Sequence, residues 1–497
     1  MGKSSEICIM VIFGGSGDLA RRKLVPALYN LMKRDTILDG FTILGISRSP
    51  LSDEEYRERL RSALEESGTP PEISMWLRFS AGIHYLSADY HSADTYERIK
   101  AKLAEHDAGR GATGNRLYYL AAAPSDYEGI IRNLGNSGLA RGEGGAGWAR
   151  VIIEKPFGQN LDSAIALNRV VAEQFQEEHV YRIDHYLGKE TVQNLLVFRF
   201  ANGIFEPLWN RQYVDSIQIT AAEDIGVGTR ASYYEQAGAL RDMIQNHVLQ
   251  LLTLVAMEPP PDFTAKSVRD EKIKVLRSIR PIAHGEVAAA SVRGQYGRGF
   301  ISGKPVPAYR EEKGVSPDSK TETYVAIRFL IENWRWAGVP FYVRTGKNLA
   351  KHVTEISIQF RRTPHWIFRQ SAFAGLGANV LSLRIQPDEG IGLKFFAKEP
   401  GQSMHIQPVV MNFGYRDSFG FPIASAYERL LLDCFRGDPT LFNRADSVET
   451  AWALVQPFLD VWAEYPARNI PCYDSGAWGP READELLERE NRSWCVL

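Results

Sequence analysis

The chain has 497 residues, too many for one ordinary hydrophobic core, so two domains are expected. Its composition, 44% hydrophobic and 24% charged, is typical of a soluble globular protein. Lys and Arg total 58 against 60 Asp and Glu, so no excess charge indicates a nucleic-acid or membrane partner. A local basic pocket for an anion is still compatible with this balance.

The four cysteines, Cys8, Cys434, Cys472 and Cys495, lie far apart and show no CxxC spacing. They predict neither a disulfide framework nor a zinc site, and a reducing cytoplasm is the expected location. No apolar run is long enough to span a bilayer. The early run ICIMVIFGG has no small-residue cleavage site after it, so we expect a buried strand there, not a signal peptide.

About the first 160 residues alternate between short β-branched runs and helical patterns. The expected strands are 7–15, 41–48, 83–89, 116–124 and 149–158, and the expected helices are 18–34, 53–67 and 94–106. This order predicts an α/β, Rossmann-type domain built on a parallel, doubly wound sheet. The glycine-rich stretch 141–148 is expected to be a loop before the last of these strands.

The stretch GGSGDLA (14–20) lies between the first strand and the first helix. In that position backbone N–H groups and a helix N-terminus can bind the pyrophosphate of a dinucleotide. Its form is Gly14-x-x-Gly17-x-x-Ala20, not the commoner G-x-G-x-x-G, and the alternative is a turn that serves only strand–helix geometry. The expected contacts of the dinucleotide are Gly14, Gly15, Ser16, Gly17, Asp18 and Leu19.

The ends of the second and last of these strands add two basic residues. The second strand ends in GISRS, with Arg48 and no acid, and a guanidinium can bind a 2′-phosphate through two parallel hydrogen bonds. This favours NADP over NAD, with NAD as a weaker alternative. Lys155, in EKP at the end of the last strand, could reach a ligand at the same edge of the sheet, or could be an ordinary solvated lysine.

After about residue 186 the pattern changes to alternating segments typical of half-buried antiparallel strands. These are 215–224, 322–334, 354–362, 379–387 and 391–399. A long helix is expected at 239–257, further helices near the C-terminus, and an extended excursion at 281–317. We therefore predict residues 1–185 as the dinucleotide-binding domain and 186–497 as an α+β domain with a large antiparallel sheet.

His247 lies on the apolar face of the predicted long helix, together with Leu240, Ile244 and Leu251. A core histidine is the simpler interpretation of such a position. A dehydrogenase acting on a sugar alcohol, however, needs a base of near-neutral pKa, usually a histidine held by a carboxylate. Asp242 is five residues away, about 140° around an ideal helix, so that carboxylate must come from elsewhere.

Taken together, several segments resemble the glucose-6-phosphate dehydrogenase family. They occur in the same order and character as in that family, from the first strand into the last third of the chain: GGSGDLA, EKPFG, RIDHYLGKE, GALRDMIQNH and DSKTETYVAIRFLIENWRWAGVPFYVRTGK. RIDHYLGKE and NWRWAGVPFYVRTGK are the specific ones. The resemblance implies oxidation of glucose 6-phosphate to 6-phosphogluconolactone with reduction of NADP, the first step of the oxidative pentose phosphate pathway.

The resemblance also implies roles for particular residues. His247 would be the general base and Asp184 the carboxylate that pairs with it. The 6-phosphate would be bound by His185, Tyr186 and Lys189, and the sugar hydroxyls by Glu223 and Asp242. Lys347 matches the first of two substrate-contacting lysines, whereas Lys351 follows one position too early for the second. Asp89 and Tyr90 are weaker cofactor candidates, beside the glycine turn, Arg48 and Lys155.

The same resemblance implies a homodimer or homotetramer, formed through the sheet domain, with no metal ion. Two other classes stay open. A dehydrogenase of non-phosphorylated sugars or polyols would have little use for His185, Tyr186 and Lys189, and would act equally on glucose and glucose 6-phosphate. A non-enzymatic NADP sensor would not need His247, and would bind NADP without turning over any sugar phosphate.

Replacing Arg48 with alanine tests the cofactor prediction. Because a guanidinium–phosphate contact is a charge-assisted interaction of about 1.5–3 kcal/mol, Arg48→Ala is expected to weaken NADP binding roughly tenfold or more. Binding of NAD, which has no 2′-phosphate, should hardly change. The check is a pair of titrations with the two dinucleotides, and an equal loss for both would contradict a 2′-phosphate contact.

Overall fold

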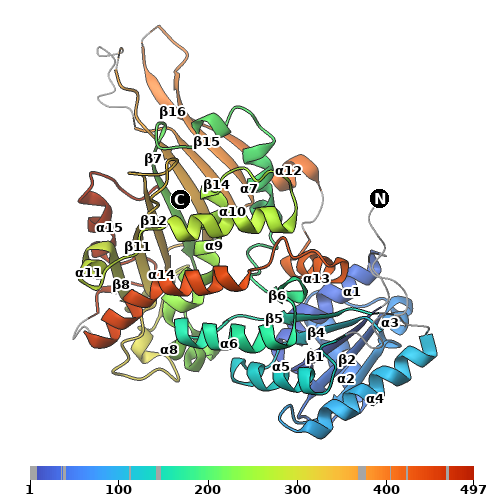
Figure 1. Cartoon of the computed structure of the whole chain (residues 1–497). Coiled ribbons are helices and arrows are strands. Elements are labelled where there is room, and N and C mark those ends of the chain that lie inside the picture. Colours follow the sequence, from blue (N-terminus) through green and yellow to red (C-terminus); the bar gives the residue numbers. More distant parts are fainter. Residues whose placement is uncertain are drawn as a thin grey trace. The chain divides into compact units, whose positions relative to one another are not determined.

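In the computed structural model, the strands of the first 182 residues form one parallel sheet (Figure 1). The structure describes residues 8–34, 36, 41–110, 114–141, 147–365, 367, 377–402, 404–420, 424–465 and 470–497. Most of the predicted glycine-rich loop, residues 142–146, lies outside the described residues. No helix among the described residues is long and apolar enough to cross a membrane.

The chain divides into two units. Unit 1 comprises Met1–Lys189, Asp262–Arg269 and Ala424–Glu449, and unit 2 comprises Glu190–Pro261, Asp270–Ile423 and Thr450–Leu497. A single boundary after residue 185 therefore does not describe the division, because two later segments return to unit 1. The later of them, Ala424–Glu449, is held there by long-range hydrogen bonds such as that from Arg150 to the carbonyl of Cys434 at 2.8 Å.

The sheet of unit 1 has six strands in the order β3-β2-β1-β4-β5-β6, all paired in parallel. This is the Rossmann order, and it confirms the predicted fold of this domain. The strands are β1 (Ile9–Phe13), β2 (Thr42–Ser47), β3 (Ile83–Ser87), β4 (Arg116–Leu120), β5 (Ala149–Ile153) and β6 (Val180–Arg182). Every residue of the central strands β1 and β4 is buried, which explains their continuous apolar runs.

Helices connect these strands. They are α1 (Val25–Lys33), α2 (Asp53–Glu66), α3 (Ile73–Ser80), α4 (Ala93–Arg110), α5 (Tyr127–Asn136) and α6 (Leu161–Gln174), and α13 (Ala426–Arg436) joins them from the later chain. The start of α2 shows how sequence sets a boundary. Ser52 accepts the N–H of Glu55 at 3.2 Å while Glu55 accepts the N–H of Ser52 at 2.8 Å, a complete capping box.

Unit 2 contains a nine-stranded sheet in the order β16-β15-β14-β13-β7-β12-β11-β8-β17. Its strands are β7 (Val214–Ala222), β8 (Ser291–Tyr296), β11 (Tyr324–Leu330), β12 (Pro340–Gly346), β13 (Val353–Phe360), β14 (Val380–Gln386), β15 (Gly390–Lys398), β16 (Ile406–Gly414) and β17 (Cys472–Tyr473). The predicted large sheet is confirmed, and most pairs are antiparallel. The pairs β7–β12 and β8–β17 are parallel, so the sheet is mixed.

The predicted excursion at 281–317 is only partly irregular. It contains β8, which pairs with β11 in the large sheet, and a small hairpin of β9 (Gly299–Ile301) and β10 (Lys304–Val306). The remaining helices of unit 2 are α7 (Glu190–Phe200), α8 (Ala231–Ala239), α9 (Leu249–Ala256), α11 (Val287–Ala290), α12 (Tyr415–Phe419) and α15 (Arg481–Glu488). Helices α10 (Ala265–Ser278) and α14 (Ala445–Glu464) include residues of both units.

The long helix predicted at 239–257 is present, but its first half is π-helical. The segment η7 (Leu240–Val248) lies between α8 and α9, and it packs on the central strands β7 and β12. A turn closed by i→i+5 hydrogen bonds takes more residues than an α-helical turn. Residues five apart therefore lie closer to the same face in η7 than the ideal α-helix predicted.

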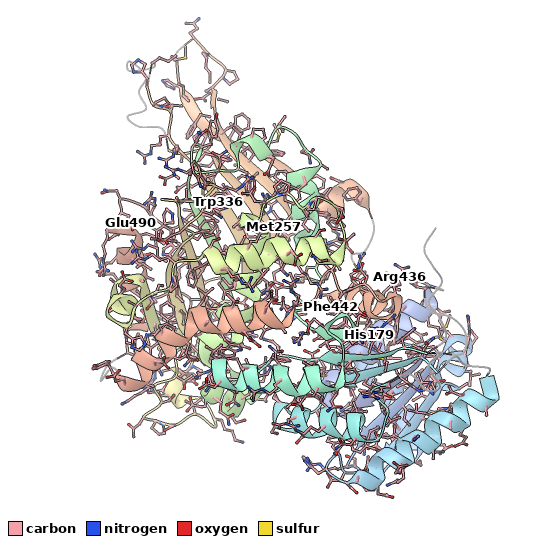
Figure 2. All side chains as sticks on the ribbon, in the orientation of Figure 1. His179, Met257, Trp336, Arg436, Phe442 and Glu490 are labelled. Carbon is pink, nitrogen blue, oxygen red and sulfur yellow. The ribbon has the colours of Figure 1, made fainter. Side chains whose placement is uncertain are left out.

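Three side chains satisfy the last carbonyl groups of α9, which have no partner inside the helix. Arg199 donates to the carbonyls of Leu254 and Met257 at 3.0 and 2.9 Å. The indole N–H of Trp209 donates to Val255 and that of Trp336 to Ala256, both at 2.8 Å. Figure 2 labels Trp336 and Met257 close together at this helix end.

Two neighbouring tryptophans provide a matched stability test. The side chain of Trp336 is fully buried, whereas that of Trp334 is 97% exposed. Trp336→Ala is expected to lower the free energy of unfolding by about 3–5 kcal/mol, because it leaves a cavity and an unsatisfied carbonyl. Trp334→Ala should change it by less than about 0.5 kcal/mol.

Urea unfolding followed by circular dichroism checks this pair. Equal losses of stability in Trp336→Ala and Trp334→Ala would contradict the role of Trp336 at the end of α9.

Candidate active site

The glycine turn follows β1 directly, and helical backbone begins at Asp18. Gly14 has a φ of 90°, and a Cβ atom there would lie 2.4 Å from the carbonyl oxygen of Ala121. The N–H groups of Gly14 and Gly15 both donate to the carbonyl of Ile46, at 2.9 and 3.0 Å. This close approach requires glycine and brings a helix N-terminus to the carboxyl edge of the sheet, where a pyrophosphate can be bound.

The other predicted loop residues differ in exposure. Gly17 and Asp18 are exposed, whereas Ser16 and Leu19 are half-buried. Asp18 lies 3.6 Å from Arg22, one turn along the helix. The loop is therefore open to solvent at Gly17 and Asp18, at the start of the helix.

The residues predicted beside the dinucleotide have different surroundings. Arg48 follows β2 and is exposed, as is Asp89 after β3. Tyr90 is buried, and its hydroxyl donates to the carbonyl of Ile46 at 3.2 Å, the same group that fixes the glycine turn. The Tyr90 side chain thus supports the turn from within the protein, and its contact with the dinucleotide stays a prediction.

Lys155 is half-buried and follows β5, next to the buried carboxyl group of Glu154. Glu154 accepts hydrogen bonds from the hydroxyls of Tyr119 at 2.5 Å and Tyr427 at 3.2 Å. Burial raises the pKa of Glu154, and the two phenols oppose that shift. This hydrogen-bonded group fixes the backbone at the position from which Lys155 extends.

The segment 180–190 turns sharply after β6. Asp184 is 1% exposed and accepts the N–H of Tyr186 at 3.0 Å, and Lys189 donates its N–H to the Tyr186 carbonyl at 3.1 Å. The Lys189 ammonium lies 5.2 Å from the Tyr186 ring centroid, and the His185 ring lies 5.1 Å from it. The turn therefore gathers the three predicted phosphate-binding residues.

Arg182, at the start of this segment, is buried in unit 1. Its guanidinium pairs with Glu177 at 2.7 Å and its backbone forms a β-bridge with Asn443. These contacts assign Arg182 to the packing of unit 1.

A cavity of about 750 Å³ lies within unit 1 and includes His185 and Lys189 in its wall. Arg22 and Lys23, which sequence reasoning did not select, line the same cavity. The signal was present in the run RRK that follows the glycine turn on the first helix. Tyr427 also lines this cavity, and its ring lies nearly parallel to that of His185, with 6.5 Å between the ring centroids.

In unit 2, the predicted residues Glu223 and Lys347 meet because β7 and β12 end side by side. Glu223 follows β7, Lys347 follows β12, and their side chains form an ion pair. The Lys347 ammonium also lies 5.5 Å from the ring centroid of Tyr234.

Asp242 is buried at the start of η7 and belongs to the same group. It accepts the hydroxyl hydrogen of Tyr233 at 3.2 Å. Burial raises the pKa of Tyr234 well above its usual value, and the Asp242 and Glu322 carboxylates raise it further. Carboxylates and an ammonium group thus surround Tyr234, an arrangement that suits a polyhydroxylated ligand.

The side chain of His247 is fully buried near the C-terminal end of η7, and its backbone N–H donates to Oδ1 of Asn246 at 2.6 Å. The π-helical backbone changes its relation to Asp242, because the five-residue spacing no longer corresponds to 140° of rotation. The angle of about 140° expected for an ideal α-helix therefore does not apply to this pair, and the source of the carboxylate that holds His247 stays a prediction.

Lys351 does not join Lys347. Its side chain is exposed and lines a separate cavity of about 510 Å³ with Arg384, Lys394 and the C-terminal residues. Asn348, with a φ of 49°, turns the chain immediately after Lys347, so the two lysines lead to different places. Among the residues that the structure describes, no group of three or more His, Cys, Asp or Glu side chains could hold a metal ion.

Comparison with known proteins covers the whole chain. The family model described as "Glucose-6-phosphate dehydrogenase, NAD binding domain" matches residues 11–194, and that described as "Glucose-6-phosphate dehydrogenase, C-terminal domain" matches residues 196–495. A glucose-6-phosphate 1-dehydrogenase of Aggregatibacter actinomycetemcomitans is 49% identical over 99% of this chain and 97% of that protein. One from Chlamydia pneumoniae is 46% identical over 99% and 96%.

Two solved structures are similar over essentially their whole length. One is a glucose-6-phosphate dehydrogenase in complex with its substrate glucose-6-phosphate, with a TM-score of 0.90, 36% identity and full coverage of both chains. The other is glucose-6-phosphate 1-dehydrogenase from Mycobacterium avium, with a TM-score of 0.83, 36% identity and 99% coverage of both.

Proposed function

The chain belongs to the glucose-6-phosphate dehydrogenase family, and from this premise we propose that it oxidises glucose 6-phosphate to 6-phosphogluconolactone with NADP as electron acceptor. The observation that carries the proposal is the grouping of His185 and Lys189 with Arg22 and Lys23 around one cavity. Several cationic donors suit a phosphate dianion, and a non-phosphorylated sugar would not need them.

The cofactor proposal is supported by the close-packed glycine turn and by Arg48. Gly14–Leu19 would hold the pyrophosphate, the exposed Arg48 side chain the 2′-phosphate, and Lys155 a group near the nicotinamide. When bound, NADP supplies the acceptor for the hydride that leaves C1 of the sugar.

In the proposed mechanism, His247 takes the proton from the C1 hydroxyl group. Its imidazole is buried, so this proton transfer is shielded from bulk water. Asp184 is proposed to pair with the imidazolium and stabilise its charge. Glu223, Asp242 and Lys347 are proposed to orient the sugar hydroxyls, which is supported by their meeting around Tyr234.

We also propose a homo-oligomer formed through the large sheet. The proposal is supported by the edge strand β16, where Val410 and Met411 are 55% and 63% exposed. A cytoplasmic location and a place in the oxidative pentose phosphate pathway complete the proposal. The location is supported by four cysteines that form no disulfide.

His247→Asn tests the mechanism. Asparagine keeps a polar side chain of similar size but cannot act as a base, so kcat is expected to fall by roughly 10²- to 10⁴-fold. The measurement is NADPH absorbance with saturating glucose 6-phosphate, and circular dichroism confirms that the variant is folded. Wild-type turnover in His247→Asn would refute the assignment of the base.

Lys189→Ala tests the phosphate site. Loss of one charge-assisted interaction of about 1.5–3 kcal/mol is expected to raise the KM for glucose 6-phosphate roughly 10- to 100-fold. The KM for free glucose, which has no phosphate, should change by less than about threefold. Lys351→Ala, in the separate cavity, is the matched control and should affect neither constant; equal effects of Lys189→Ala on both sugars would remove Lys189 from the phosphate site.

A further inference from the structure

The buried carboxyl group of Glu322 lies where the neighbouring strands β8, β11 and β12 approach the π-helical segment. Glu322 precedes β11, and the next residue, Thr323, is fully buried. The N–H of Thr323 donates to the carbonyl of Gly294 at 2.8 Å, and its carbonyl accepts the N–H of Lys347 at 2.9 Å. The backbone of Glu322 is therefore fixed between neighbouring strands, next to the proposed sugar-binding lysine.

Glu322 contacts the backbone twice at the junction of α8 and η7. Its carbonyl oxygen accepts the N–H of Ala239 at 3.0 Å, and its Oε1 accepts the N–H of Leu240 at 3.1 Å. The first N–H groups of a helix have no partner within it, so these two bonds satisfy groups that would otherwise be buried without one. A carboxylate at this end also interacts favourably with the helix dipole.

Gly238 makes this contact possible. Its φ of 64° and ψ of 177° interrupt the helical backbone between α8 and η7. A Cβ atom at this position would lie 2.3 Å from Oε1 of Glu322, which is shorter than any real contact. The Glu322 carboxyl group therefore fills the space that a side chain at position 238 would need, so the kink requires glycine.

The environment of Glu322 keeps it in place whether it is charged or neutral. Burial raises the pKa of the Glu322 carboxyl group, while the Leu240 N–H and the charges of Arg241 and Arg293 oppose that shift. A carboxylate oxygen and the carbonyl oxygen of a carboxylic acid both accept the Leu240 N–H. The contact of Glu322 with η7 thus depends on hydrogen bonding and shape, and not on the charge of the carboxyl group.

We propose that Glu322 is a positioning residue for the reaction, which sets the start of η7 and thereby the places of Asp242 and His247. This inference rests on the proposed function, which assigns sugar binding to Asp242 and proton transfer to His247. Glu322 itself touches neither the sugar nor the cofactor in this account. Its effect on the reaction passes through the helix.

Three variants of Glu322 test the proposal, and the first two are the alanine and glutamine variants. Glu322→Ala removes the acceptor of the Leu240 N–H, so kcat for glucose 6-phosphate is expected to fall at least tenfold. The KM for NADP should stay within about twofold, because the proposed NADP contacts lie in unit 1. Glu322→Gln keeps an amide oxygen in the same position and should restore kcat to within about threefold of wild type.

Glu322→Asp is the second test, in case the alanine variant fails to fold. It keeps the charge but withdraws the carboxylate by one methylene, so it too should lose kcat. Amide hydrogen exchange over residues 239–248 should accelerate in the alanine and aspartate variants and stay near wild type in the glutamine variant. Glu271→Ala, which removes another buried carboxylate of unit 2, on α10, is the matched control and should leave kcat and this exchange unchanged.

Wild-type kcat and exchange in Glu322→Ala would overturn the proposal. So would equal losses of kcat in all three variants with no change in exchange over 239–248. A wild-type protein that does not oxidise glucose 6-phosphate would instead contradict the proposed function, and the exchange measurement would then still decide whether Glu322 fixes η7.

Discussion

A helix buried in a protein core must have the polar groups at both of its ends satisfied, and the helical run from Leu240 to Ala256 depends on this constraint. At the start of η7, Glu322 accepts two backbone N–H groups. At the end of α9, Arg199, Trp209 and Trp336 donate to successive carbonyls. Because the run is held at both ends, the buried imidazole between them has a defined place on the central strands.

Strand ends do the rest of the positioning within each unit. In unit 1 the carbonyl of Ile46, at the end of β2, accepts bonds from the glycine turn and from Tyr90, which fixes the edge where a dinucleotide is proposed to bind. In unit 2 the parallel pairing of β7 and β12 brings Glu223 and Lys347 together. In both cases a rigid sheet carries functional side chains on the residues just beyond its strands, as is common for binding sites on sheet scaffolds.

The sequence predicted the features that local patterns encode. Continuous apolar runs identified β1 and β4, and strict alternation identified β7 and β13, because burial on one or both faces sets those patterns. The polar strand β8 was missed because the sequence SVRGQY lacks such a pattern, and its place comes from pairing with β11. The π-helical geometry of η7 and the contact of Glu322 with Gly238 depend on long-range packing. Arg22 and Lys23 could have been selected from the basic run after the glycine turn. The spacing already set Lys351 apart from the family pattern, and the separate cavity that it lines depends on the turn at Asn348, which the sequence does not show.

The most direct test of the account is the ratio of kcat/KM for glucose 6-phosphate to that for glucose, measured on the unaltered protein with NADP. Several charge-assisted contacts of about 1.5–3 kcal/mol each predict a ratio of roughly 10³ or more in favour of the phosphorylated sugar. Equal values for the two sugars would contradict the phosphate site around His185 and Lys189, and with it the proposed substrate.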